Sequence, residues 1–172
     1  MNNIDLFNEV RSWLDAEKLA FLADDGNTSF QLRMNLDHGL VPIRILCEES
    51  PAMLQIICSV PVKVPKEKIS STGLALHRLN ARLRVGAFHL DAEDGLVMYR
   101  LAQPIHPELE MEEQFRDAFG TALNTVDHHI LPLALHFCST PRSREILAQL
   151  SPAKKTSKSG KSIAPRARFE LN

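Results

Sequence analysis

The stretch 66–101 constrains the fold more than any other part of the chain, because its hydrophobic period changes from that of a helix to that of strands. Between 67 and 83, apolar residues three, four and seven positions apart predict one buried helix face, formed by Ile69, Leu76, Leu79 and Leu83. Two short apolar runs follow, 85–90 and 96–101, separated by five turn-forming residues that end at Gly95. Glycine can adopt the positive φ that such a hairpin loop requires. We therefore predict a helix, a corner and a tight hairpin.

The periodicities of the remaining chain predict further helices and a sheet. An apolar face at helical spacing predicts an N-terminal helix over 3–19, and alternating apolar residues predict antiparallel strands over 21–64. A long apolar seam over 108–137 predicts a helix that Pro132 should kink or end, because proline has no amide N–H. A short helix is predicted over 140–150. The order of these elements predicts an α+β fold, with one mostly antiparallel sheet and helices packed on one face.

The strand pattern also predicts positions within the sheet. Pro42 suits an edge strand or an early strand position, because it cannot donate to a ladder. If the two strands that follow pair on their apolar faces, Cys58 lies opposite Ile43 and Cys47 lies opposite Leu54. These two thiols are then far apart, and the number of cysteines is odd. All three are therefore predicted to be reduced core residues.

The bulk properties predict a soluble globular protein with one core. A chain of 172 residues with 44% hydrophobic residues is long enough to bury a single sizeable core. No run approaches the roughly 20 apolar residues that a membrane span needs. The first residues lack the basic and apolar regions of a secretion signal. We therefore expect a cytoplasmic protein.

The charges are divided unevenly along the chain. Six basic residues and one acidic residue lie in 152–172, whereas the first 151 residues hold 14 basic and 20 acidic ones. The basic residues of this tail are Lys154, Lys155, Lys158, Lys161, Arg166 and Arg168. The tail is rich in lysine and serine and is expected to be disordered. We therefore predict an α+β domain over 1–150 and a flexible basic tail over 151–172.

The sequence carries no complete catalytic motif. Residues 160–162 copy the end of a phosphate-binding loop, but the glycine required five residues earlier is missing. Residues 106–108 copy the His-x-Glu of zinc deaminases, but no Pro-Cys-x-x-Cys follows. Paired acids fall in turns or in the first turns of a helix, where acids are favoured for structural reasons. We expect no catalytic residue, no cofactor and no enzymatic activity.

Seven histidines suggest a metal site, and the densest group is 127–129 together with His136. On a helix, the neighbours His128 and His129 point about 100° apart. His129 and His136 share a face but lie roughly 10 Å apart along the axis, which is too far for one ion. No metal ligand is therefore predicted from this group.

Four short motifs carry a resemblance to a known family: Leu79-Asn80, Gly86-Ala87-Phe88, Asp94-Gly95 and Tyr99-Arg100. Together with the glutamate-rich helix that follows, they resemble the YbjN family of bacterial proteins. The resemblance implies a fold similar to that of type III secretion chaperones. It also implies a role in the regulation of sensory transduction, or in the binding of extended client segments by a homodimer. No catalytic residue comes with it.

Three residues of these motifs are candidates for contact with a partner. Asn80 interrupts the apolar stripe of its helix, and its amide either satisfies backbone groups at the corner before Gly86 or contacts a partner. Tyr99 and Arg100 lie on opposite faces of one strand, so one of them points outward as a candidate interface anchor.

The sequence supports three functional hypotheses. The first is a non-enzymatic protein-binding module, chaperone-like or regulatory, that acts as a homodimer and receives a protein or peptide on its sheet. The second is a nucleic-acid-associated regulator whose basic tail contacts phosphates. The third is a histidine-dependent metal protein.

Overall fold

The structure is a computed structural model that describes residues 5–137. The described chain contains three α-helices, six strands and two short 3-10 turns. In chain order they are α1 (Leu6–Ala16), β1 (Phe21–Asp24), η1 (Asp25–Asn27), β2 (Ser29–Leu36), β3 (Gly39–Glu49), β4 (Ala52–Lys63), η2 (Lys66–Lys68), α2 (Ile69–Asn80), β5 (Ala87–Leu90), β6 (Leu96–Pro104) and α3 (Met111–Phe137).

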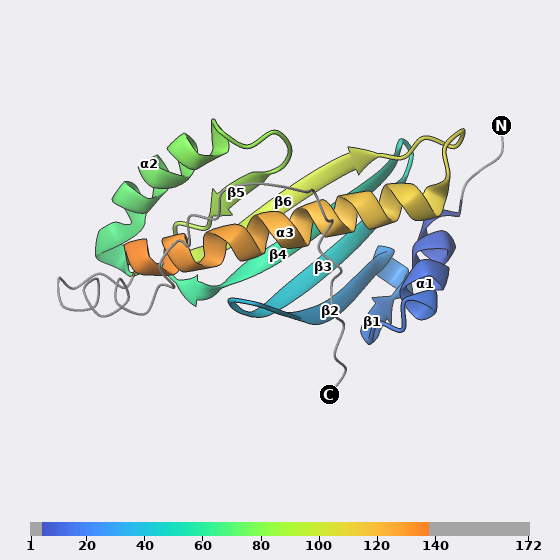
Figure 1. Cartoon of the computed structure of the whole chain (residues 1–172), viewed down its shortest axis with the longest axis horizontal. Coiled ribbons are helices and arrows are strands. Elements are labelled where there is room, and N and C mark those ends of the chain that lie inside the picture. Colours follow the sequence, from blue (N-terminus) through green and yellow to red (C-terminus); the bar gives the residue numbers. More distant parts are fainter. Residues whose placement is uncertain (1–4, 138–172) are drawn as a thin grey trace, which may run out of the picture.

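The six strands form one sheet in the order β1-β2-β3-β4-β6-β5, and each neighbouring pair is antiparallel. The first four strands are a meander, as the alternation over 21–64 predicts. The hairpin of β5 and β6 then joins the meander through β6, which pairs with β4 (Figure 1). The loop of this hairpin contains Gly95 at φ +69°, so the predicted positive φ is confirmed.

The predicted register of β3 and β4 is confirmed. Ile43 pairs with Cys58, and Cys47 pairs with Leu54. Both thiols are free and buried. Burial raises the pKa of each from 9.0 to about 12, because the apolar surroundings disfavour the thiolate. These two cysteines are therefore inert core residues.

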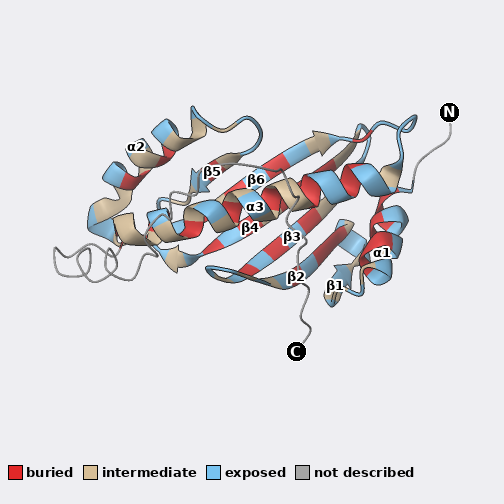
Figure 2. Ribbon diagram, viewed as in Figure 1, coloured by how far each residue is buried: buried red, intermediate tan, exposed pale blue. Residues whose placement is uncertain are grey.

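All three helices pack their apolar residues into the hydrophobic cluster formed by one face of the sheet. Asp5 caps the N-terminus of α1, because its carboxylate accepts a hydrogen bond from the backbone N–H of Asn8 at 3.1 Å. The ring of Trp13 on α1 meets that of Phe119 on α3 edge to face at 5.3 Å. Buried and exposed residues alternate along the central strands (Figure 2). The α+β class and the packing of the helices on one face are thus confirmed.

The predicted corner after α2 is held by two side chains. The amide of Asn80 donates to the backbone C=O of Phe88 at 2.9 Å and accepts from the Phe88 N–H at 2.8 Å. The hydroxyl of Tyr99 donates to the C=O of Val85 at 2.8 Å. Gly86 lies between these contacts at φ +67°, and a Cβ there would overlap the ring of Tyr99. The corner therefore needs a glycine for both conformation and space.

Two expectations need correction. Pro42 does not mark an edge of the sheet, because β3 is an internal strand. The other alternative, an early strand position, agrees with the structure, because the ladder between β3 and β4 starts one residue later, at Ile43. The edges are β1 and β5. The prediction that Pro132 ends the helix is wrong, because α3 starts at Met111 and continues to Phe137; the alternative, a kink at Pro132, stays a prediction. The helix persists because Ile130, before the proline, and Phe137, after it, are both buried in the core.

Several predictions concern residues outside the described range. These are the helix over 140–150, the third cysteine, the boundary at 150 and the basic tail over 151–172. Within 5–137, no helix is long and apolar enough to cross a membrane.

Candidate partner-binding face

The side chains that alternate with the core residues point to the opposite face of the sheet, which we call the open face because no helix within 5–137 lies on it. Register places one residue from each strand in a row across this face. The row reads Leu22, Gln31, Arg44, Ile57, Arg100 and Ala87. Ile57 is therefore flanked by an arginine on each neighbouring strand.

The open face carries apolar side chains that remain accessible. Ile57 in the middle of the row is half-buried, as are Leu46 and Met98 in the adjoining rows. Leu22 on the edge strand β1 is 75% exposed. A face that combines accessible aliphatic and methionine side chains with arginine has the composition of a protein interface.

A chain of hydrogen bonds fixes one of the two arginines. Arg100 donates from Nε to the Oε1 of Gln55 at 2.8 Å, and its Nη2 donates to the same oxygen. Gln55 in turn donates from Nε2 to the carboxylate of Glu48. Gln55 is only 5% exposed, although it lies on the open face. A neutral amide therefore orients Arg100 without neutralising its charge.

The arginines of the open face lack acidic partners. Arg33, Arg44 and Arg100 are exposed, and none has a carboxylate within 4.0 Å among the residues that the structure describes. The pKa of Asp24 is lowered, mainly by hydrogen bonds from Asn27. The positive charge of Arg44 lowers the same pKa by a smaller amount. The open face is therefore more cationic than the rest of the described chain.

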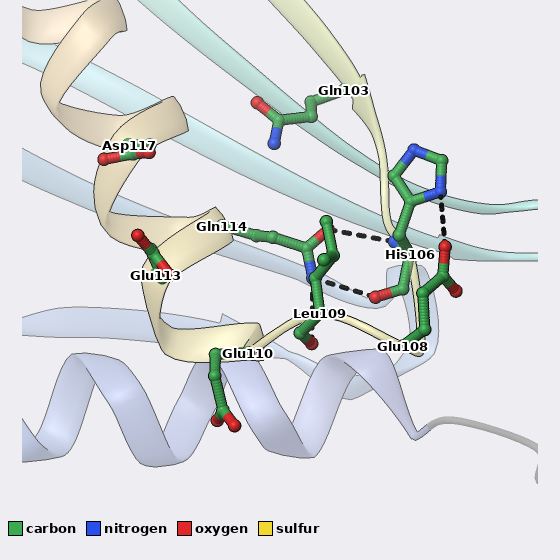
Figure 3. Close-up of a pocket in the computed structure, with 8 residues that line it drawn as sticks. All are labelled: Gln103, His106, Glu108, Leu109, Glu110, Glu113, Gln114 and Asp117. Atoms are coloured by element: carbon green, nitrogen blue, oxygen red, sulfur yellow. Dashed lines mark hydrogen bonds and ion pairs between the residues drawn. The ribbon is translucent and has the colours of Figure 1, made fainter.

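A second candidate is a pocket of about 490 Å³ before and along the start of α3 (Figure 3). Half of the residues that line it are acidic; the lining is Gln103, His106, Glu108, Leu109, Glu110, Glu113, Gln114 and Asp117. The buried amide of Gln114 is occupied by the backbone N–H and C=O of His106, at 2.9 and 3.0 Å. The carboxylates are exposed and do not converge, and Glu110 points away from the others in Figure 3. The pocket offers an acidic surface rather than a catalytic constellation.

Two histidines of the described chain contact residues other than histidine at different places in the fold. His38 in the β2–β3 turn meets Asp127 of α3 through its backbone N–H at 3.1 Å and its ring Nδ1 at 3.0 Å. The ring of His129 packs edge to face on Phe88 at 5.6 Å. Among the described residues, no group of three or more histidine, cysteine or acidic side chains is placed to hold a metal ion.

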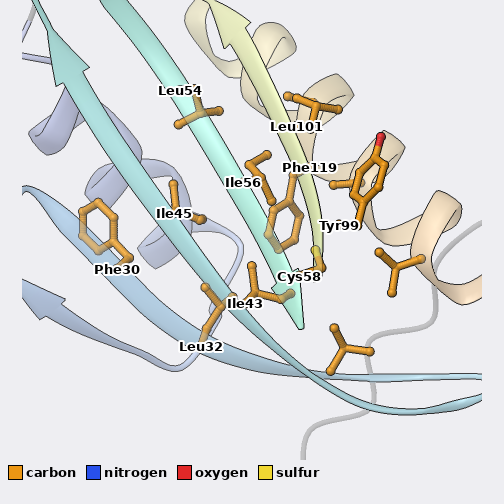
Figure 4. Close-up of a cluster of buried hydrophobic side chains, with 14 of the residues drawn as sticks. Phe30, Leu32, Ile43, Ile45, Leu54, Ile56, Cys58, Tyr99, Leu101 and Phe119 are labelled. Carbon is orange, nitrogen blue, oxygen red and sulfur yellow. The ribbon is translucent and has the colours of Figure 1, made fainter. Parts of the chain in front are cut away.

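The structure separates the three predicted partner contacts. Tyr99 is fully buried in the core on the α3 side (Figure 4). The amide of Asn80 is occupied by the backbone of Phe88. The polar atoms of these two residues therefore hydrogen-bond the backbone of the corner, and their contact with a partner stays a prediction. Arg100 is the outward residue of the pair and lies on the open face. The six basic residues predicted to contact phosphates lie outside the described range.

Comparison with known proteins decides the family. A family model described as "putative bacterial sensory transduction regulator", YbjN, matches residues 7–133. The chain belongs to the YbjN family. The match includes the whole sheet and most of α3, so the elements that build the open face are family elements.

Solved structures show the same fold. The crystal structure of YbjN from E. coli superposes with a TM-score of 0.59 at 15% identity, covering 76% of this chain and 92% of that one. ExsC in its complex with ExsE gives a TM-score of 0.50 at 17% identity, covering 80% of this chain and 100% of that one. A search of curated protein sequences finds no significant match. The YbjN-family fold is therefore established for this chain.

Sequence reasoning missed most of the open face. Arg33, Arg44, Gln55 and Ile57 were not among the predicted site residues. A usable signal existed for two of them, because the predicted pairing of Cys58 with Ile43 also places Arg44 beside Ile57. The pairing of β4 with β6, which brings Arg100 to the row, has no local signal.

Proposed function

We propose that this YbjN-family chain is a non-enzymatic protein-binding module, chaperone-like or regulatory, that receives a segment of a protein partner on the open face of its sheet. The observation that carries this proposal is the row in which Ile57 lies between Arg44 and Arg100. Covering accessible apolar surface gains roughly 25 cal/mol per Å². Arginine side chains around such surface give polar specificity.

The family supports a role of this class. The matching model carries a regulatory description. ExsC, which shares the fold, was crystallised in complex with ExsE. Binding by a sheet face requires no reactive group. We place the protein in the cytoplasm, where the two buried thiols of β3 and β4 stay reduced.

We also propose that the protein acts as a homodimer. Leu74 on α2 is 53% exposed and Val85 after it is 52% exposed, and neither lies on a strand. They offer apolar surface apart from the open face, so a dimer can form without occupying the partner site. Light scattering tests this part: a mass near 19 kDa at high micromolar concentration counts against the dimer.

The basic tail supports a second candidate, contact with nucleic acid. Six cations within 152–172 would bind phosphates weakly and without sequence preference. Truncation after Leu150 tests it. DNA retention that is equal for the full and the truncated chain removes the tail from the function.

The principal experiment places a photo-reactive amino acid on the open face in one variant and on the helix layer in another, and both variants are tested in the native cell. One variant carries it at Ile57 on the open face, and the matched variant carries it at Asn124, which is exposed on α3. We expect a discrete protein adduct from position 57 and none from position 124. The absence of any adduct at position 57, from a variant that unfolds at the wild-type temperature, refutes the proposed function.

A further inference from the structure

We infer that the segment received on the open face is acidic and apolar, with two carboxylates that reach Arg44 and Arg100 and an apolar residue between them that covers Ile57. This inference rests on the proposed function and deepens it by naming the chemistry of the partner. Four observations carry it: the unmatched charge, the fixed arginine, the spacing across the strands and the signs of the other charged surfaces.

The unmatched charge comes first. Arg11 pairs with Asp25, and Arg116 pairs with Glu17 and Glu112. By contrast, the open-face arginines have no carboxylate within ion-pair distance in the part of the chain that the structure describes. A face that leaves its arginines unmatched is complementary to an acidic ligand.

The second observation is the orientation of Arg100. Gln55 accepts from both Nε and Nη2 of Arg100, which leaves N–H groups of the guanidinium free to bind a carboxylate. Gln55 is itself held by Glu48 and almost fully buried. Ordering of the long arginine side chain therefore precedes binding, and less conformational entropy is lost when a carboxylate arrives.

The third observation is geometric. Arg44, Ile57 and Arg100 lie on three successive strands, so the two arginines are separated by roughly 10 Å across the sheet. Carboxylates seven residues apart on one helix face lie at about 10.5 Å, and those three residues apart on a polyproline II segment lie at about 9 Å. A segment that crosses the strands in either form presents an apolar residue to Ile57 between the two acids.

Two features count against the chain's own tail and against nucleic acid as occupants of the open face. The chain's own tail is basic, as is the open face, so the two repel each other. A single-stranded nucleic acid would also stack its bases on exposed aromatic rings, and no phenylalanine, tyrosine or tryptophan within 5–137 is exposed.

The experiment selects peptides from a random 12-residue display library on the immobilised full chain. We expect the enriched sequences to carry at least two acidic residues around an apolar one. A synthetic peptide from this set should bind the Arg44→Gln/Arg100→Gln variant at least about tenfold more weakly, and its affinity for the wild type should fall several-fold when salt is raised. The matched control is Arg78→Gln, an exposed arginine on α2, which should leave the affinity unchanged.

Contrary results separate the inference from the proposed function. Enrichment of neutral or basic peptides, or binding that survives in the double variant, overturns the acidic chemistry even when photo-crosslinking at position 57 succeeds. Failure of both experiments removes the proposed function as well. If the double variant loses self-association, the occupant of the open face is a second copy of the chain. If duplex DNA displaces the peptide from the chain truncated after Leu150, the occupant is nucleic acid. Either result overturns the inference.

Folding of the variants is checked by thermal unfolding. If the double variant does not fold, Arg44→Gln alone keeps the test decisive, because no hydrogen bond or ion pair within 5–137 involves the Arg44 side chain. Its affinity for the peptide should still fall several-fold. An unchanged affinity in this variant overturns the inference.

Discussion

Replacement of Asn80 by alanine should destabilise the corner between α2 and β5. Phe88 belongs to an edge strand, and its N–H and C=O bond to the amide of Asn80 as they would to a further strand. Each of these two hydrogen bonds contributes about 1 kcal/mol net, and a buried backbone group left unpaired costs about 1–3 kcal/mol. Phe88 is 3% exposed, so solvent replaces the amide poorly. We expect Asn80→Ala to lower the free energy of unfolding by about 2–4 kcal/mol.

Urea unfolding followed by tryptophan fluorescence measures this loss. Trp13 is the only tryptophan, and its ring packs on Phe119 in the core, so its emission reports the global transition. Hydrogen exchange of the Phe88 amide gives a local readout, and its protection should fall. The matched control is Asn124→Ala on the exposed side of α3, which should change stability by less than about 0.5 kcal/mol. A loss as small as that for Asn80→Ala would refute the structural role and would leave the amide available for a partner.

Three further predictions concern the same core. Tyr99→Phe removes the hydrogen bond to Val85 and should cost about 1 kcal/mol in urea unfolding. Gly86→Ala should cost about 2 kcal/mol or more, because φ is +67° and the added Cβ overlaps the ring of Tyr99; a neutral result would contradict the close approach. Burial raises the pKa of Cys47 and Cys58 from 9.0 to about 12, so their contribution to stability is complete below about pH 9 and is lost as the pH rises toward about 12. The urea midpoint should fall over this interval, and a Cys47→Ala/Cys58→Ala variant should show a shallower fall.

The sequence predicts the parts of this fold that depend on neighbouring residues. Alternation and turn residues place β1 to β4 in a meander, and the apolar faces set the register of β3 on β4 down to the Ile43–Cys58 pair. The glycines of the corner and the hairpin loop have positive φ where the chain turns. The continuation of α3 past Pro132 was less predictable. Buried side chains on both sides of the proline outweigh the missing amide hydrogen bond.

The candidate site was harder to predict, because it is assembled from strands that are distant in sequence. Arg100 bonds Gln55 across 45 positions, and no periodicity within either strand specifies that β6 pairs with β4. Gln55 in the sequence is only a polar break in an apolar strand. Its role becomes visible when Arg100 and Glu48 are placed on either side of it. Of the three residues predicted to contact a partner, Asn80 and Tyr99 hydrogen-bond the backbone of the corner, and Arg100 lies on the open face.

The small net charge of −1 is the sum of an acidic excess in the first 151 residues and a basic excess in the tail. The open face is cationic through Arg33, Arg44 and Arg100, whereas the pocket before α3 is acidic and is lined by Gln103, an inward residue of β6, so it lies on the helix side of the sheet. The tail over 152–172 has the sign of the open face and the opposite sign to the pocket. Like charge therefore disfavours contact between the tail and the arginines of the open face. An acidic partner on the open face and a basic tail do not compete for one site, so removal of the tail should leave the affinity for an acidic peptide almost unchanged. A tail that inhibited binding by occupying the open face would contradict this arrangement of charge.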